Sequence, residues 1–294
     1  MAGPVKNTAR KLSHLVSKVG IDPFTRDDFF LVSSTVAQDP ARLVLVGGQA
    51  LEVWGVLLDV LAPTGETSPL TEDTDWLGSA DDAQWLAELL GSEDVTVELT
   101  RATLDDNTPN TATMYIERRD GRILFMDFLH SVIGLSEADI NKLAVQIDFK
   151  FAPGQNPASI RVLHPLHCLA CRMANLKELP SKRDGNGQMQ AHWAVDIMHA
   201  YLASVAQRGD AIQVRKACHV VAKLAEYGPA EYCYIQFNVD PLQAITPEVV
   251  EAGGELFATK DWPNTVERIK NKREKWHRKE AYAQAIRASK RQAG

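Results

Sequence analysis

Short apolar blocks separated by polar turns dominate the first half of the chain. Residues 43–46 form an apolar run that ends at Gly47 and Gly48, which predicts a buried strand followed by a turn. From residue 49 to residue 61 the apolar positions recur at helical spacing, so a helix is expected directly after that turn. A Thr followed three residues later by an Asp, at 25–28, predicts the capped start of an earlier helix.

The other apolar blocks predict further strands and helices. A helix is expected at 80–90, where two acidic residues occupy the first turn and a glycine follows the last one. Strands are expected at 72–78, 95–99, 111–117, 122–129, 143–149 and 159–163. Helices are expected at 166–179, 188–207, 211–227, 246–257 and 263–289. The pattern predicts an α+β fold, with a mixed sheet flanked by helices and followed by a helical C-terminal domain.

These elements divide the chain into four expected parts: an N-terminal helical segment (1–40), a core domain (41–164), a helical domain (165–260) and a basic C-terminal helix (261–294). The composition, 45% hydrophobic and 24% charged over 294 residues, is typical of a globular protein. No apolar run reaches the roughly 18 residues that span a bilayer, and the start of the chain lacks a signal-peptide pattern. We therefore expect no membrane partner and a cytoplasmic location.

The four cysteines are too few for a disulfide framework in a chain of this length, which favours a reducing compartment. Two of them, Cys168 and Cys171, lie close to His164 and His167. This spacing leaves a structural zinc site open. Buried thiols and capping histidines are the favoured interpretation, because the two His–Cys pairs diverge on a helix.

The net charge of -6 is unevenly distributed. Residues 268–291 contain ten Lys or Arg but only two Glu, a local charge of +8 that leaves -14 on the remainder. Trp276, His277 and Tyr282 are interleaved with these cations. Cations with aromatic residues suit contact with an RNA backbone and stacking on its bases. The alternative, a helix held against an acidic body, is left open.

Two aspartates, Asp73 and Asp75, stand two apart on an expected strand, so their side chains point to one face roughly 6–7 Å apart. Mg²⁺ or Mn²⁺ suits such a pair because it takes hard oxygen ligands and still binds phosphate oxygens. Asp127 interrupts the otherwise apolar run 123–129, where an unpaired carboxylate would be costly. It is a candidate third metal ligand, or else a strand-end aspartate bound by a backbone amide.

Gly47 and Gly48 are the candidate phosphate contacts, because a glycine turn before a helix lets backbone amides approach a phosphate. The segments LVGGQAL at 45–51 and TEDTD at 71–75 resemble the polymerase-β-type nucleotidyltransferase superfamily, and within it the AbiEii-like toxins of type IV toxin–antitoxin systems. The resemblance covers roughly residues 41–205 and identifies the core domain as a nucleotidyltransferase domain.

The resemblance implies transfer of a nucleotidyl group from an NTP to a hydroxyl of RNA, a protein or a small molecule. It also implies Mg²⁺ or Mn²⁺ as cofactor, tRNA as a candidate acceptor and an antitoxin protein as partner. By the same resemblance, Thr71 would join the two glycines in nucleotide binding. Arg172 occupies the family's basic position and would contact phosphates, and Asp196 the acidic one. An ion pair between these two residues is the structural alternative.

The chain departs from the family pattern at two positions near the aspartates. Pro69 stands where the family usually carries Arg, and Thr74 stands between the aspartates where an apolar residue is usual. These departures leave two alternatives open. One is a catalytically impaired nucleotide-binding or interaction module of the same fold, and the other is a small-molecule nucleotidyltransferase of the antibiotic-modifying type.

Overall fold

The computed structural model describes residues 20–63, 73–103, 105–106, 108–150 and 157–292. Internal contacts divide the chain into two compact units. The sheet unit comprises Met1–Val56 and Leu61–Cys168, and the helical unit comprises Leu57–Val60 and Leu169–Gly294. Each unit has its own buried apolar core.

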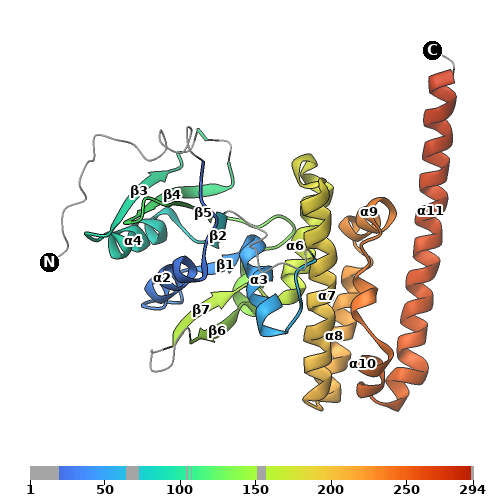
Figure 1. Ribbon diagram of the computed structural model, residues 1–294. Coiled ribbons are helices and arrows are strands. Elements are labelled where there is room, and N and C mark those ends of the chain that lie inside the picture. The colour runs from blue at the N-terminus through green and yellow to red at the C-terminus, as the bar shows by residue number, and fades with distance from the viewer. Residues whose placement is uncertain (1–19, 64–72, 104, 107, 151–156, 293–294) are drawn as a thin grey trace. The chain divides into compact units, whose positions relative to one another are not determined.

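A seven-stranded mixed sheet forms the centre of the sheet unit (Figure 1). Its strands are β1 (Val44–Val46), β2 (Asp73–Leu77), β3 (Val95–Arg101), β4 (Asn110–Arg118), β5 (Ile123–Leu129), β6 (Val145–Phe149) and β7 (Ala158–Val162). Their order is β3-β4-β5-β2-β1-β7-β6. The pairs β2–β5 and β1–β7 are parallel and the others antiparallel. The predicted α+β fold with a mixed sheet is thereby confirmed.

The two faces of the sheet differ in burial, as the alternation of side chains in β4 and β5 shows. One face carries apolar side chains that are almost completely buried, namely Ala112, Met114, Ile116, Leu124, Met126 and Phe128. The residues between them, including Thr113, Phe125 and Asp127, are half-buried on the opposite face. Because side chains alternate along a strand, the apolar pattern of the sequence places the acidic residues on the more open face.

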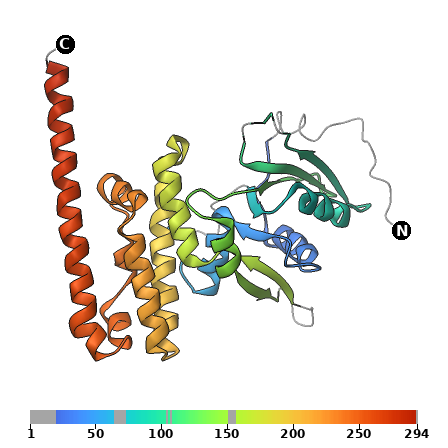
Figure 2. The same ribbon diagram turned by 180° about the vertical axis from the view of Figure 1, so that it is seen from behind.

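Helices α2 (Arg26–Val36) and α4 (Ala80–Leu90) contact each other and pack against strands of the sheet (Figure 2). Each begins with a capping box, in which Thr25 pairs with Asp28 and Ser79 with Asp82. The start predicted at 25–28 and the helix predicted at 80–90 are therefore confirmed. A short helix, α5 (Glu137–Leu143), precedes β6 and was not predicted.

Asp28 does more than cap α2, because it lies at 1% exposure between the helix and the β4–β5 hairpin. It accepts hydrogen bonds from Thr25 and, at 2.5 Å, from Arg122 Nη1. Burial raises the pKa of this carboxyl, but the hydrogen bonds from Thr25 and Arg122 outweigh it, so the pKa falls below its usual value. Asp28 thus joins α2 to the sheet as a buried anion.

The described part of the helical unit contains six α-helices, together with the short helical segments η1 (Pro180–Lys182), η2 (Pro241–Ala244) and η3 (Phe257–Asp261). The α-helices are α6 (Pro165–Glu178, whose first residues belong to the sheet unit), α7 (Gly185–Gln207), α8 (Ala211–Leu224), α9 (Gly228–Phe237), α10 (Pro247–Ala252) and α11 (Trp262–Gln292). The helix expected at 246–257 ends early, because Gly253 follows α10 and Gly254 adopts a positive φ of 95°. Helix α9 was not predicted. All four cysteines are buried thiols.

Ion pairs attach the first half of α11 to the rest of the helical unit. Arg273 pairs with Asp240 where both side chains are largely buried, at 13% and 11% exposure, and its guanidinium lies over the ring of Tyr234. Arg268 contacts Glu226 at 2.5 Å. This half matches the alternative of a basic helix held against an acidic body. No helix within the described ranges has the length and apolar character of a membrane span.

Candidate functional site

Three carboxylates meet on the open face of the sheet because of how β2 and β5 are paired. Asp73 and Asp75 alternate with Thr74 on β2, and Asp127 on β5 is in register with Asp75. One carboxylate oxygen from each residue lies within 4.8 Å of the others. All three side chains are half-buried. Three ionised carboxylates at this spacing repel one another, and a divalent cation relieves that repulsion. This acid cluster (Asp73, Asp75 and Asp127) has the donor set and spacing to hold a divalent metal ion.

Asp127 is oriented by a neighbouring side chain. Asn110 Nδ2 donates a hydrogen bond to Asp127 Oδ1 at 2.7 Å. Asn110 is the first residue of β4, beside an irregularity in its register with β5 between Asn110 and Ala112. Such bulges commonly redirect a side chain next to a functional site. Sequence reasoning missed Asn110, because nothing in the local pattern indicates that this strand end lies beside Asp127.

Gly47 lies directly against the acid cluster. Helix α3 (Gly47–Leu57) begins at this residue, immediately after β1, and Val46 is in register with Asp75. The φ of Gly47 is 69°, and a Cβ placed on it would lie 1.9 Å from Asp75 Oδ2. Only glycine fits there, because any side chain would combine backbone strain with a collision. The N-terminus of α3 therefore starts beside the carboxylates. The first amides of a helix have no partner within that helix and favour an anion.

Of the two residues that depart from the family pattern, the structure describes Thr74 but not Pro69. Thr74 is 1% exposed and lies on the buried face of β2, so its side chain does not enter the acid cluster. Its hydroxyl makes no hydrogen bond to the part of the chain that the structure describes. Pro69 and the predicted nucleotide contact Thr71 lie outside the described residues.

The two remaining site predictions fall on the helical unit. Arg172 is 8% exposed on α6, and its Nη1 donates to Gln190 Oε1 at 2.8 Å. Its Nε has no hydrogen-bond partner among the described residues. Asp196 is exposed on α7. The ion pairs of the described residues do not join Arg172 to Asp196, and the roles expected of both residues in the site stay predictions.

In the described part of the chain, the histidine and cysteine group near residue 165 does not bring three metal-binding side chains together. Within the described ranges, the acid cluster is the only group of three or more His, Cys, Asp or Glu side chains placed to share a metal ion. Burial, with the neighbouring His167, lowers the pKa of His164 to about 4, so the ring is neutral at pH 7. Its Nδ1 accepts from the backbone N–H of Leu166 at 3.1 Å, as expected for a capping histidine.

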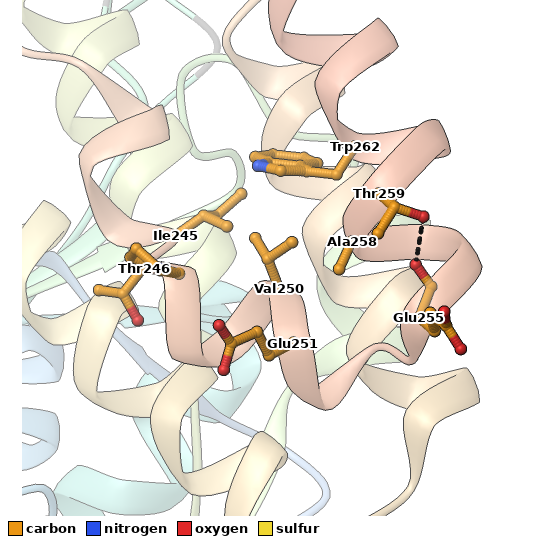
Figure 3. Close-up of a pocket in the computed structure, with 9 residues that line it drawn as sticks. Ile245, Thr246, Val250, Glu251, Glu255, Ala258, Thr259 and Trp262 are labelled. Atoms are coloured by element: carbon orange, nitrogen blue, oxygen red, sulfur yellow. Dashed lines mark hydrogen bonds between the residues drawn. The ribbon is translucent and has the colours of Figure 1, made fainter.

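A separate hollow lies in the helical unit, around the turn that precedes α11 (Figure 3). Ile245, Val250 and Ala258 line it together with the ring of Trp262, and the side chains of Glu251 and Glu255 lie along the same rim. It contains none of the residues that the sequence indicates for catalysis, metal binding or nucleotide binding.

Comparison with known proteins gave few matches. No family model matches the chain, and no curated protein matches it. Among solved structures it is similar to the polyadenylate synthase of Megavirus, with a TM-score of 0.31 and 10% sequence identity. The similarity covers 66% of this chain and 40% of the viral chain, so this chain spans well under half of the length of that structure.

Proposed function

We propose that this chain is a metal-dependent nucleotidyltransferase, which moves a nucleotidyl group from an NTP to an acceptor hydroxyl. One observation carries the proposal: three carboxylate side chains from two paired strands converge within 4.8 Å. The start of α3 beside them adds a site for phosphate. In this chemistry the protein mainly positions groups and neutralises charge, which is what such a cluster can do.

The chain's own residues have distinct roles in this proposal. Asp73, Asp75 and Asp127 would hold Mg²⁺ or Mn²⁺, and the bound ion would neutralise charge on the phosphates. The amides at Gly47 and Gly48 would receive the phosphates. The acceptor oxygen forms a bond to the α-phosphorus, the bond to the β-phosphate breaks, and pyrophosphate leaves. Asp127, fixed by Asn110, would accept the proton of the acceptor hydroxyl.

Arg172 is proposed as a phosphate contact. It is a buried guanidinium whose hydrogen bond goes to a neutral partner, Gln190, and a buried charge without a balancing anion is costly. A phosphate would provide that anion and match the planar fork of the guanidinium. Asp196 and Thr71 keep their expected roles, in ordering this arginine or the acceptor and in nucleotide binding. Arg172→Lys should weaken NTP binding, measured by equilibrium dialysis.

RNA is the acceptor we propose, with tRNA as a candidate, bound through an outer stripe of α11 (Lys275, Arg278 and Tyr282). These residues follow one helix face at spacings of three and four, and all are exposed, Tyr282 at 72%. Two cations followed by an exposed aromatic suit a single strand that presents phosphates and stacks a base. Binding should weaken steeply as salt rises. Triple alanine substitution of the stripe should abolish binding, whereas Lys216→Ala with Lys223→Ala on α8 should not.

The proposed activity is tested by incubating the protein with each labelled NTP, Mg²⁺ or Mn²⁺ and total RNA, beside an Asp73→Asn/Asp75→Asn variant. We expect label on RNA from the unmutated protein and none from the variant. Nucleotide binding without transfer to RNA, protein or small-molecule acceptors would favour an impaired binding module. Transfer only to small cationic acceptors would favour the antibiotic-modifying type. The position of Thr74, on the face away from the acids, weighs against impairment by that residue.

A toxin role with an antitoxin partner is implied by the sequence resemblance alone and is proposed on that basis. It predicts that induced expression of the chain arrests bacterial growth. The Asp73→Asn/Asp75→Asn variant should not arrest growth at equal expression. Growth arrest by both forms would show that toxicity does not depend on nucleotidyl transfer.

A further inference from the structure

Two aromatic side chains stand next to the acid cluster on the same face of the sheet. Tyr115 on β4 is in register with Phe125 on β5, and Phe125 is in register with Asp73 on β2. Registered neighbours point to one face, so these three side chains form a row across the sheet. The adjacent row contains Thr113, Asp127 and, on β2, the second aspartate of the cluster.

The position of this aromatic pair (Tyr115 and Phe125) is unusual for side chains that serve the core. Both are half-buried, and their rings are 4.9 Å apart between centroids with planes tilted by 43°. The apolar core lies on the opposite face, at Met114 and Met126 among others. Aromatic rings left partly open beside a polar site offer an apolar surface to a flat ligand.

Tyr115 also has a polar end. Burial, followed by the negative charges of Asp127 and Glu98, raises the pKa of its phenol above the usual value. A phenol hydroxyl is a hydrogen-bond donor at neutral pH. The surface combines two ring faces with one donor, directly beside the carboxylates.

We propose that Tyr115 and Phe125 form a platform on which a nucleobase stacks, while a phosphate or hydroxyl of the same nucleotide lies at the acid cluster. The inference rests on the proposed function and adds to it the position of the base. Adjacent strands are roughly 4.8 Å apart, so the distance between Phe125 and Asp73 is one that a single ribose can span. The base belongs either to the incoming NTP or to the end of the acceptor RNA, since both present the same flat ring.

The test is a binding measurement on the whole chain with Tyr115→Leu and Phe125→Leu, singly and together. Leucine keeps an apolar side chain in the strand and removes the ring. The probes are the four NTPs, inorganic tripolyphosphate, a five-nucleotide RNA and the same RNA with an abasic 3′ end. Phe29→Leu is the matched control, because Phe29 also pairs with a ring in the sheet unit, Phe149, at 5.7 Å.

Loss of one stacked base should weaken binding about tenfold or more. Weaker NTP binding with unchanged tripolyphosphate binding assigns the platform to the incoming base. Weaker binding of the intact RNA only, with the abasic RNA unaffected, assigns it to the acceptor. Tyr115→Phe should retain most of the affinity. Unchanged affinity for every probe in the double variant would overturn the inference and leave the pair as a sheet contact.

The inference and the proposed function can fail separately. If the leucine variants bind and transfer nucleotide as the unmutated chain does, the platform is wrong and the transferase stands. If the unmutated chain binds nucleotides through the aromatic pair but transfers nothing, the transferase is wrong and the platform stands. If it binds neither NTP nor RNA, both are wrong.

Discussion

Replacing Gly47 by alanine perturbs the acid cluster without touching any of its acids. The added Cβ would lie 1.9 Å from Oδ2 of Asp75, 2.8 Å from its Cγ and 2.9 Å from its Cβ. Rotation of the Asp75 side chain relieves the first two contacts but leaves the third, because the Cβ atom moves only with the backbone. Since carbon atoms normally approach to about 3.5–4.0 Å, either the turn or β2 must shift by about 0.5–1 Å.

The expected magnitudes separate stability from function. Alanine at a φ of 69° costs about 1–2 kcal/mol in backbone strain. The forced contact adds about 1–3 kcal/mol, as overpacking usually does. A misplacement of about 1 Å at the reacting groups costs about 100-fold in rate. We therefore expect Gly47→Ala to lose about 2–5 kcal/mol of unfolding free energy and nearly all metal-dependent transfer.

Gly121 provides the matched control, because its φ is 84° and a Cβ there would meet nothing within 4 Å. Gly121→Ala should lose only the backbone strain and keep its activity. Urea unfolding gives the two free energies, and label transfer and Mn²⁺-induced stabilisation are measured where both variants remain folded. Unchanged transfer and Mn²⁺ response in Gly47→Ala would refute the reasoning, as would an equal loss of activity in Gly121→Ala.

Three further predictions concern single residues. Asp73→Asn should abolish the rise in Tm that Mg²⁺ or Mn²⁺ produces in the unmutated chain, measured by thermal unfolding; a retained rise would exclude Asp73 as a ligand. Thr74→Val should raise the free energy of unfolding by about 1 kcal/mol, because it replaces a buried hydroxyl that makes no hydrogen bond within the described residues, and it should leave transfer unchanged. Lower stability in this variant would contradict that burial argument. Arg273→Leu should cost about 3–5 kcal/mol by leaving Asp240 as an uncompensated buried charge, and adding Asp240→Leu should restore much of it in a double-mutant cycle.

The pH dependence of stability gives one more prediction, at Asp28. Its pKa is lower in the folded chain than its usual value, so its contribution to stability is complete above the unfolded value, about 3.9. The contribution is lost as the pH falls through the folded pKa. Asp28→Asn should therefore lower stability at pH 7 and flatten its decline in acid, measured by urea unfolding between pH 2 and pH 7. An equally steep acid decline in the variant would contradict the assignment.

Local patterns in the sequence were sufficient to predict most of the elements. Short apolar blocks bounded by turns indicated the strands. The Thr25–Asp28 cap indicated the start of α2, and acidic residues in the first turn indicated the start of α4. The errors have local causes as well: α5 is only seven residues long, and Gly253 and Gly254 end α10 earlier than its apolar spacing suggested. Helix α9 was missed, although the glycine and proline at its start and the Asn238 after its end are visible in the sequence.

The candidate site likewise has some features that local sequence predicts and others that only the tertiary structure decides. Its two-residue aspartate spacing on one strand and the glycine turn are local features, so the sequence by itself determined that Asp73 and Asp75 share a face and that a helix follows Gly47. Only the tertiary structure decided that Asp127 reaches them, because β5 pairs with β2 across an intervening β3 and β4 in the chain. The pairing of β4 with β5 placed Asn110 beside Asp127 and Tyr115 beside Phe125. Strand pairing depends on hydrogen bonding and burial between segments that are distant in the sequence, so local periodicity cannot predict it.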